Sequence, residues 1–211
     1  MKNLIPLLLM LFVFSGRSHA EDSVDSVALP AVAHELNRMQ IEDQRYRGEN
    51  DTIFKTTPWT DSLEHWVWSR QSEIDSTNVK RLEELIDQYG WLGMHKVGND
   101  GAEAVFLIIQ HAGLAVQEKY LPKMRESVAA GDFPPTCLAY LEDRIRISEG
   151  KPQLYGTQVK VDMETGKPEL YPIEDEVNVD KRRAEVGLGP LADYCAEFGI
   201  VYVPVGDSIK E

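Results

Sequence analysis

The chain has 211 residues, and its 22 basic residues against 35 acidic residues give a formal net charge of −13. Such an acidic surface repels nucleic acid and anionic lipid, so we expect no nucleic-acid partner and regard a basic protein as the compatible kind of macromolecular partner. A chain of this length buries enough surface to fold without metals or many disulfides.

The first twenty residues have the order of a secretory signal. Lys2 precedes an apolar run from Leu4 to Phe14, and small residues end at Ala20. Since a bilayer core needs roughly 20 apolar residues, this run is too short to span one. We therefore expect cleavage after Ala20, a single domain over 21–211 with its core at about 29–198, and an exported protein, periplasmic or extracellular, with no membrane segment. Its formal charge is then −15.

Apolar residues at helical spacing predict a series of helices up to Ser148. The segment 48–60 contains Pro58 and shows no hydrophobic periodicity, so we interpret it as a loop. The stretch 101–113 is apolar on nearly every side, so this helix should form the core. The predicted helices are 29–47, 61–74, one that begins near Asp75 and stops at Gly90, 101–113, 114–130 and 136–148. Residues 91–100 are predicted to be a connector.

After Gly150 the hydrophobic pattern changes from helical spacing to the alternation that is typical of a strand. Residues 153–161 favour a strand, and the turn 164–166 leads into Leu170 and Tyr171, which predicts a short hairpin. Two short helices are expected at 178–186 and 190–198. The predicted fold class is therefore mainly α, a helical bundle with a small β-hairpin appended in its C-terminal half.

The two cysteines, Cys137 and Cys195, leave two alternatives open. In an oxidising compartment a bridge would close a loop of about sixty residues and stabilise the fold by about 4 kcal/mol. Otherwise both are buried thiols that act as small apolar groups.

Familiar catalytic motifs are missing from the sequence. It has no His-Glu-x-x-His, no Cys-x-x-Cys, no glycine-flanked nucleophile serine and no phosphate loop. We therefore predict no metal and no cofactor.

His111, preceded by Gln110, ends the apolar helix and shares a face with Leu107 and Ile108. Its ring should be buried, and a buried imidazole is suited to act as a general base. The alternative is a core histidine whose nitrogens are satisfied by a carbonyl or a tyrosine.

Two further polar segments are candidates. Glu142-Asp143-Arg144 could orient His111 or bind an anion, or could be plain surface charge. In the segment 151–158, Gln153, Tyr155 and Thr157 should point inward, and Gly156 leaves room for a ligand. We interpret the group formed by Asp43, Gln44 and Arg47, and that formed by Asp180, Arg182 and Arg183, as caps and exposed ion pairs.

Three blocks resemble a bacterial family known as domain of unknown function 6624. They are GAEAVFLIIQHAG, LAYLEDRIRISEGKPQLYGTQ and LYPIEDEVNVDKRRAEVGLGPL, in that order, with a looser match from Met39 to Arg47. The resemblance covers roughly Asp75 to Tyr194. It supports the domain and supplies no activity.

Two functions follow as hypotheses. The first is a binding or interaction module for a small polar ligand or a basic partner. The second is a metal-independent, hydrolase-like enzyme with His111 as general base, Asp143 orienting it and Tyr155 donating a proton. The ligand-binding candidates are Gln110, Arg144, Gln153, Thr157 and Gln158.

Overall fold

The computed structural model describes residues 28–47, 60–162 and 165–204. These residues divide into two compact units, an N-terminal unit that ends at Phe133 and a C-terminal unit that begins at Pro134. The predicted signal peptide and most of the predicted loop 48–60 lie outside the described residues. In the part of the chain that is described, no helix combines the length and the apolar character needed to cross a bilayer.

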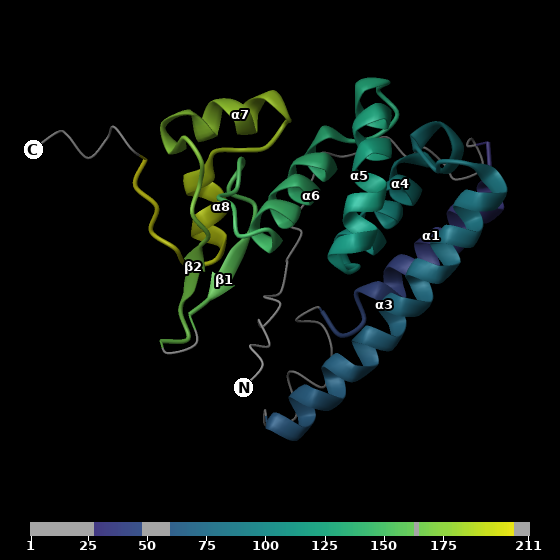
Figure 1. Ribbon diagram of the computed structural model, residues 1–211, viewed down its shortest axis with the longest axis horizontal. Coiled ribbons are helices and arrows are strands. Elements are labelled where there is room, and N and C mark those ends of the chain that lie inside the picture. Colours follow the sequence, from purple (N-terminus) through teal and green to yellow (C-terminus); the bar gives the residue numbers. More distant parts are fainter. Residues whose placement is uncertain (1–27, 48–59, 163–164, 205–211) are drawn as a thin grey trace, which may run out of the picture. The chain divides into compact units, whose positions relative to one another are not determined.

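Four helices make up the described part of the N-terminal unit, and α4 lies at its centre. They are α1 (Pro30–Asp43), α3 (Asp61–Tyr89), α4 (Met94–His111) and α5 (Leu114–Ala129). Helix α4 packs against the other three, and α1 also runs beside α3 (Figure 1). Ala104, Val105, Phe106 and Ile109 are fully buried, which confirms that the apolar run forms the core.

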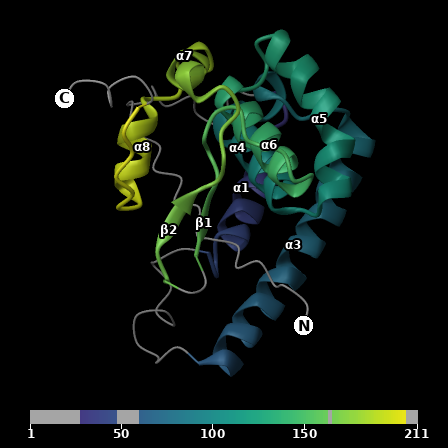
Figure 2. The same ribbon diagram turned by 60° about the vertical axis from the view of Figure 1, so that its left-hand side comes forward.

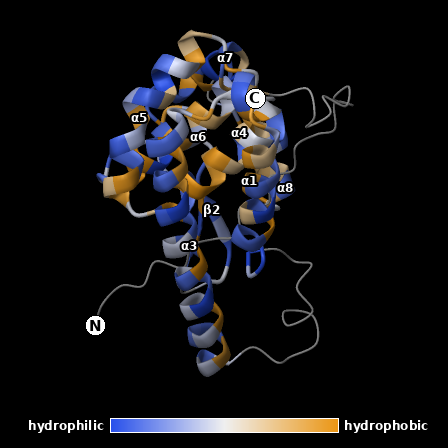
Figure 3. Cartoon of the chain, turned by 90° about the vertical axis from the view of Figure 1, so that its right-hand side faces the viewer, coloured by the Kyte–Doolittle hydropathy of each residue, from blue (hydrophilic) through white to orange (hydrophobic). Residues whose placement is uncertain are grey.

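Helix α3 is continuous over 29 residues, so the predicted break near Asp75 is wrong. Thr60 caps its start by accepting a hydrogen bond from the Leu63 amide at 3.2 Å. The hydroxyls of Ser76 and Thr77 donate to carbonyls one turn earlier instead of capping a new helix. The buried side chains of α3 follow one side of the helix, and Figure 3 shows hydrophobic residues gathered there.

The predicted connector 91–100 is partly helical. Helix α4 already begins at Met94, and Gly98, with φ at 72°, interrupts it before the buried run. Residues with a side chain rarely adopt this backbone conformation, so the glycine permits the kink.

The C-terminal unit contains α6 (Pro135–Ser148), β1 (Val159–Val161), β2 (Pro168–Leu170), a 3-10 turn η2 (Glu176–Asn178), α7 (Val179–Glu185) and α8 (Leu191–Glu197). Strands β1 and β2 lie side by side and antiparallel, with Val159 opposite Leu170 (Figure 2). The hairpin is therefore confirmed, although β1 is shorter than predicted, and Gln153 forms only an isolated parallel bridge to Ile173. The fold class is mainly α with a small two-stranded sheet in the C-terminal half.

The space beside Gly156 is filled by the protein itself. A Cβ on this glycine would lie 2.8 Å from Leu191 Cδ1, and its φ is 69°. Leu191 belongs to the small core of this unit with Val179 and Cys195. The predicted room for a ligand at Gly156 is thus occupied by a core leucine.

Cys137 and Cys195 are buried thiols and not a disulfide, which decides between the two alternatives. Burial raises the pKa of the Cys195 thiol to about 11. Since the thiolate is the reactive form, only about one molecule in a thousand carries it at pH 8.

We therefore expect Cys195 to resist alkylation in the folded protein. Iodoacetamide at pH 8 should leave its peptide unlabelled over the time in which glutathione reacts fully, and should label it in urea. Quantification of the peptide by mass spectrometry checks this. Rapid labelling of the folded chain, or labelling in urea that requires a reductant, would contradict the buried thiol.

Candidate functional site

A polar cluster lies where α1 ends, inside the N-terminal unit. We call it the Asp43 cluster; its members are Asp43, Arg47, Gln71, Asp75 and His111. Asp43 continues the buried face of α1, one helical step beyond Leu36 and Met39. Because the face that packs on α4 ends in a carboxylate, that carboxylate is carried into the interior.

Asp43 and His111 form a buried pair. The Nδ1 atom of His111 lies 2.8 Å from Asp43 Oδ2, and the two side chains are 3% and 1% exposed. A carboxylate only accepts hydrogen bonds, so Nδ1 carries the hydrogen and donates it. This contact orients the imidazole and makes Nε2 the basic nitrogen of the neutral ring.

Arg47 joins the two acids of the cluster. Its guanidinium lies 3.1 Å from Asp43 Oδ1 and 2.5 Å from Asp75 Oδ2, and it also donates to the Asp43 carbonyl. The Arg47 side chain is only 5% exposed. Charges this deep require partners, and a guanidinium can serve two carboxylates at once.

Two glutamines add further hydrogen bonds to the cluster. The Gln71 amide donates to the Asp43 carbonyl at 2.9 Å and to Asp75 Oδ1 at 2.8 Å, while its oxygen accepts from the Tyr46 amide. Gln44 donates to Asp43 Oδ2 at 2.7 Å. The Asp43 carboxylate thus contacts Gln44 and Arg47, which follow α1, and His111 at the end of α4, while Gln71 of α3 binds the Asp43 backbone carbonyl.

A pocket of about 460 Å³ adjoins the cluster. His111 and Asp75 belong to both, so the buried pair is connected with a space that a small molecule can enter. This volume is in the range of small-ligand sites. Its lining residues come from α3, the end of α4 and the start of α5: Ser72, Asp75, Ser76, Val79, Lys80, Glu83, His111, Ala112, Gly113 and Val116.

The residues predicted for one site are distributed over both units. His111 and Gln110 belong to the N-terminal unit, where Gln110 is fully buried. Asp143, Arg144, Gln153, Tyr155, Thr157 and Gln158 belong to the C-terminal unit. The carboxylate at His111 Nδ1 is that of Asp43, whereas the Asp143 oxygens bind groups of their own unit.

Asp143 organises the backbone of residues 154–157. Its carboxylate accepts hydrogen bonds from the amides of Leu154, Tyr155 and Thr157 and from the Thr157 hydroxyl, at 2.5 to 3.1 Å. Asp143 is fully buried, so the surface-charge alternative is wrong for it. Burial raises the pKa of its carboxyl, and the amide donors partly oppose that increase.

The inward-facing residues of the segment 151–158 mostly contact backbone. Gln153 donates to the carbonyls of Gln158 and Tyr171, and its oxygen accepts from the Gln158 amide. Gln153 and Thr157 are buried, as predicted, whereas Tyr155 is half-buried and Gln158, for which no burial was predicted, is buried as well. Burial, with a smaller contribution from Glu142, raises the pKa of the Tyr155 phenol. These groups hold the loop before β1 in place.

The interpretation of Asp43 and Arg47 as exposed decoration is wrong, because both are buried. The sequence did contain a signal for the burial of Asp43. Val32, Leu36 and Met39 follow one another at helical spacing, and Asp43 occupies the next position on the same face. Likewise Gln71 and Asn78 occupy positions on the apolar face of α3. Polar residues at positions that periodicity assigns to the core are therefore the pattern that identifies this cluster. The second group is also more than decoration, because Arg183 is buried and donates to two backbone carbonyls.

The arrangement suits binding and proton transfer. His111 lines the pocket, and its imidazole, oriented by the Asp43 carboxylate, is only 3% exposed. A histidine paired with a carboxylate in this way is the arrangement found in enzymes that use a histidine base. Among the described residues, no group of three or more His, Cys, Asp or Glu side chains is placed to hold a metal ion.

Comparison with protein families gives a match to most of the chain. A family described as "Family of unknown function (DUF6624)" matches residues 30–203. No curated protein and no solved structure matches the chain.

Proposed function

The chain belongs to the DUF6624 family, whose description assigns no activity, and we propose that its N-terminal unit binds a small polar ligand in the pocket beside His111. The observation that supports this most is the connection between the pocket and the Asp43 cluster. A buried Asp–Arg–Asp–His arrangement is costly to desolvate, and pairs of this kind often do not add stability over apolar packing. Its position at a pocket wall is consistent with a functional role.

Native mass spectrometry of the protein purified from its own exported compartment tests this binding. We expect a small-molecule adduct on the wild type. The variant Val79→Trp, which fills the pocket without altering the Asp43 cluster, should lose it. His111→Gln should lose it as well.

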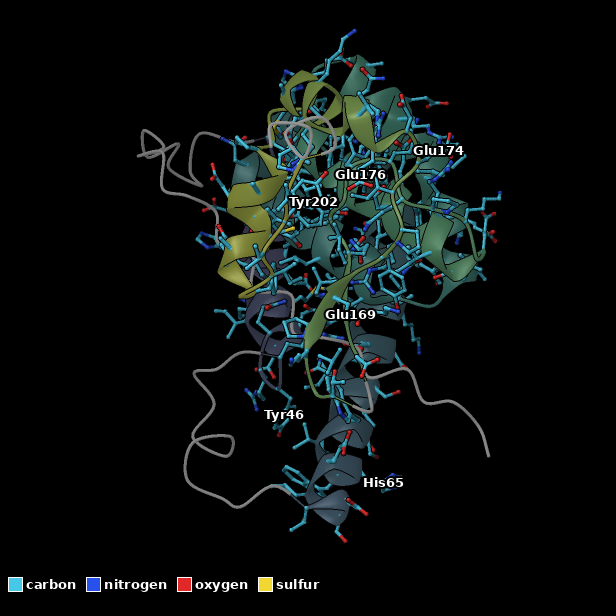
Figure 4. The ribbon with its side chains drawn as sticks, turned by 90° about the vertical axis from the view of Figure 1, so that its left-hand side faces the viewer. Tyr46, His65, Glu169, Glu174, Glu176 and Tyr202 are labelled. Atoms are coloured by element: carbon cyan, nitrogen blue, oxygen red, sulfur yellow. The ribbon has the colours of Figure 1, made fainter. Side chains whose placement is uncertain are left out.

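The matched control is His65→Gln. His65 is exposed on the first part of α3, about two turns before the pocket residue Ser72 (Figure 4). This variant should keep the adduct. The same adduct on Val79→Trp and on the wild type would contradict binding in this pocket.

A second candidate function is hydrolysis with His111 as general base. The specific observation in its favour is the 2.8 Å contact between Asp43 Oδ2 and His111 Nδ1, which orients the ring as in enzymes that use a histidine base. A panel of ester, amide and phosphoester substrates should detect activity in the wild type and in His65→Gln. His111→Gln, verified as folded by circular dichroism, should be inactive. Equal activity in all three proteins would exclude His111 from catalysis.

We further propose that the protein acts after export, in the periplasm or outside the cell. The support is the order of Lys2, the apolar run and the small residues before Glu21 in the sequence. Fractionation of cells that express the full chain, with N-terminal sequencing of the product, tests this. A product that retains Met1–Ala20 in the cytoplasm would contradict export.

A further inference from the structure

The acidic side chains at the pocket are already paired with basic residues. Asp75 Oδ2 accepts from Arg47 at 2.5 Å, and its other oxygen accepts from Gln71 at 2.8 Å. Glu83 Oε1 lies 2.7 Å from Lys119. A cationic ligand would therefore have to compete with these bases for both carboxylates.

Lys80 is the positive charge that remains on this wall. It lines the pocket from α3 and is exposed, and the described part of the chain contains no ion pair that involves it. Ser72 adds a hydroxyl group on the same helix, whereas the Ser76 hydroxyl already donates to the Ser72 carbonyl. Lys80 and the Ser72 hydroxyl can together bind an anionic group through charge and a hydrogen bond.

The local charge differs from that of the chain as a whole. The protein carries a formal charge of −13, yet each of the two acids that line this pocket, Asp75 and Glu83, has a basic partner. Gly113 also places the start of α5 at the pocket wall, where helix amides favour negative charge. Most of the acidic surface repels a small anion, but this pocket can bind one.

Because the acids of the pocket have basic partners and Lys80 has none among the described residues, we propose that the pocket is selective for a small organic anion. Its carboxylate or phosphate group is bound by Lys80. The inference rests on the binding function proposed above and specifies its ligand class. The volume of about 460 Å³ leaves space beyond the anionic group for a short polar or apolar body that reaches His111.

Titrations followed by the ¹H–¹⁵N spectrum of the full exported chain test the proposal. The probes are propionate, its neutral analogue propionamide, and inorganic phosphate. Propionate or phosphate should shift the amides of Val79, His111 and Gly113 saturably, and propionamide should not. The anion that binds more tightly distinguishes a carboxylate ligand from a phosphate ligand.

Two variants show whether Lys80 is responsible. Lys80→Gln should weaken the binding of the preferred anion about threefold or more, the range of a partly exposed ion pair. The control Lys123→Gln removes an equal charge from an exposed position on α5 outside the pocket and should bind as the wild type does.

Three results would overturn the anion selectivity. They are equal binding of propionamide and propionate, unchanged anion binding by Lys80→Gln, and the absence of shifts at the pocket amides with every probe. Equal binding of the neutral probe would still leave a ligand pocket, and the adduct measurement on Val79→Trp judges that pocket separately. Failure of the selectivity is thus distinguishable from failure of the proposed function.

Discussion

Replacement of Asp43 by alanine should lower the free energy of unfolding of the N-terminal unit by about 3–5 kcal/mol. The variant leaves Arg47 buried with one of its two carboxylates gone, and it leaves His111 Nδ1 without its acceptor. Loss of one partner from a buried charge cluster costs far more stability than loss of an exposed pair, because no water can solvate the charge that remains.

Urea unfolding followed by tryptophan fluorescence measures this effect. Trp66, Trp68 and Trp91 belong to the N-terminal unit, and the sequence contains no tryptophan after Pro134, so the fluorescence reports on the N-terminal unit. Glu42→Ala is the matched control, since Glu42 precedes Asp43 and pairs with Arg45 at an exposed site. The control should cost less than about 1 kcal/mol. Equal costs for the two variants would show that the Asp43 cluster does not stabilise the unit.

Replacement of Asp143 by alanine should be comparably damaging to the C-terminal unit, with an expected loss of about 3 kcal/mol or more. Three backbone amides and the Thr157 hydroxyl lose their shared acceptor in a buried setting. Asp143→Asn should also destabilise, because its NH₂ group would face these donors. Tryptophan fluorescence does not report on this unit, so amide hydrogen exchange is the suitable measurement.

The amides of Leu154, Tyr155 and Thr157 should exchange much faster in Asp143→Ala than in the wild type. Glu142→Ala is the control on the same helix, because the contact of Glu142 with the Tyr155 hydroxyl is long, at 3.4 Å. Its effect should stay within about 1 kcal/mol. Unchanged protection of the three amides in Asp143→Ala would contradict the organising role of this carboxylate.

Much of the secondary structure was predictable because its causes are local. Helical spacing of apolar residues located α1, α5 and α6 to within a few residues and found the buried part of α4 but not its start at Met94, and the change to alternation located the hairpin. The prediction failed where a local signal had two readings. Ser76 and Thr77 are typical of a helix start, but their hydroxyls can equally bond back to the preceding turn, as they do inside α3.

The candidate site was predictable only in part. The burial of His111 followed from the helix that it ends, and the inward direction of Gln153 and Thr157 followed from alternation. The assignment of Asp43 and Arg47 to an exposed surface failed because an acid and a base four residues apart form a common solvent-exposed pair. Here the pair continues the apolar face of α1 and is buried with it.

The sequence by itself determined most of the helical segments, which of them is the core, and that a histidine ends it in a buried position. Only the tertiary structure decided which carboxylate that histidine contacts. Asp43 and His111 are 68 residues apart, and the ends of α1 and α4 bring them together. Periodicity records which side of each helix is apolar, but the partner of a buried charge depends on where two helices end against each other, and that is a property of their packing.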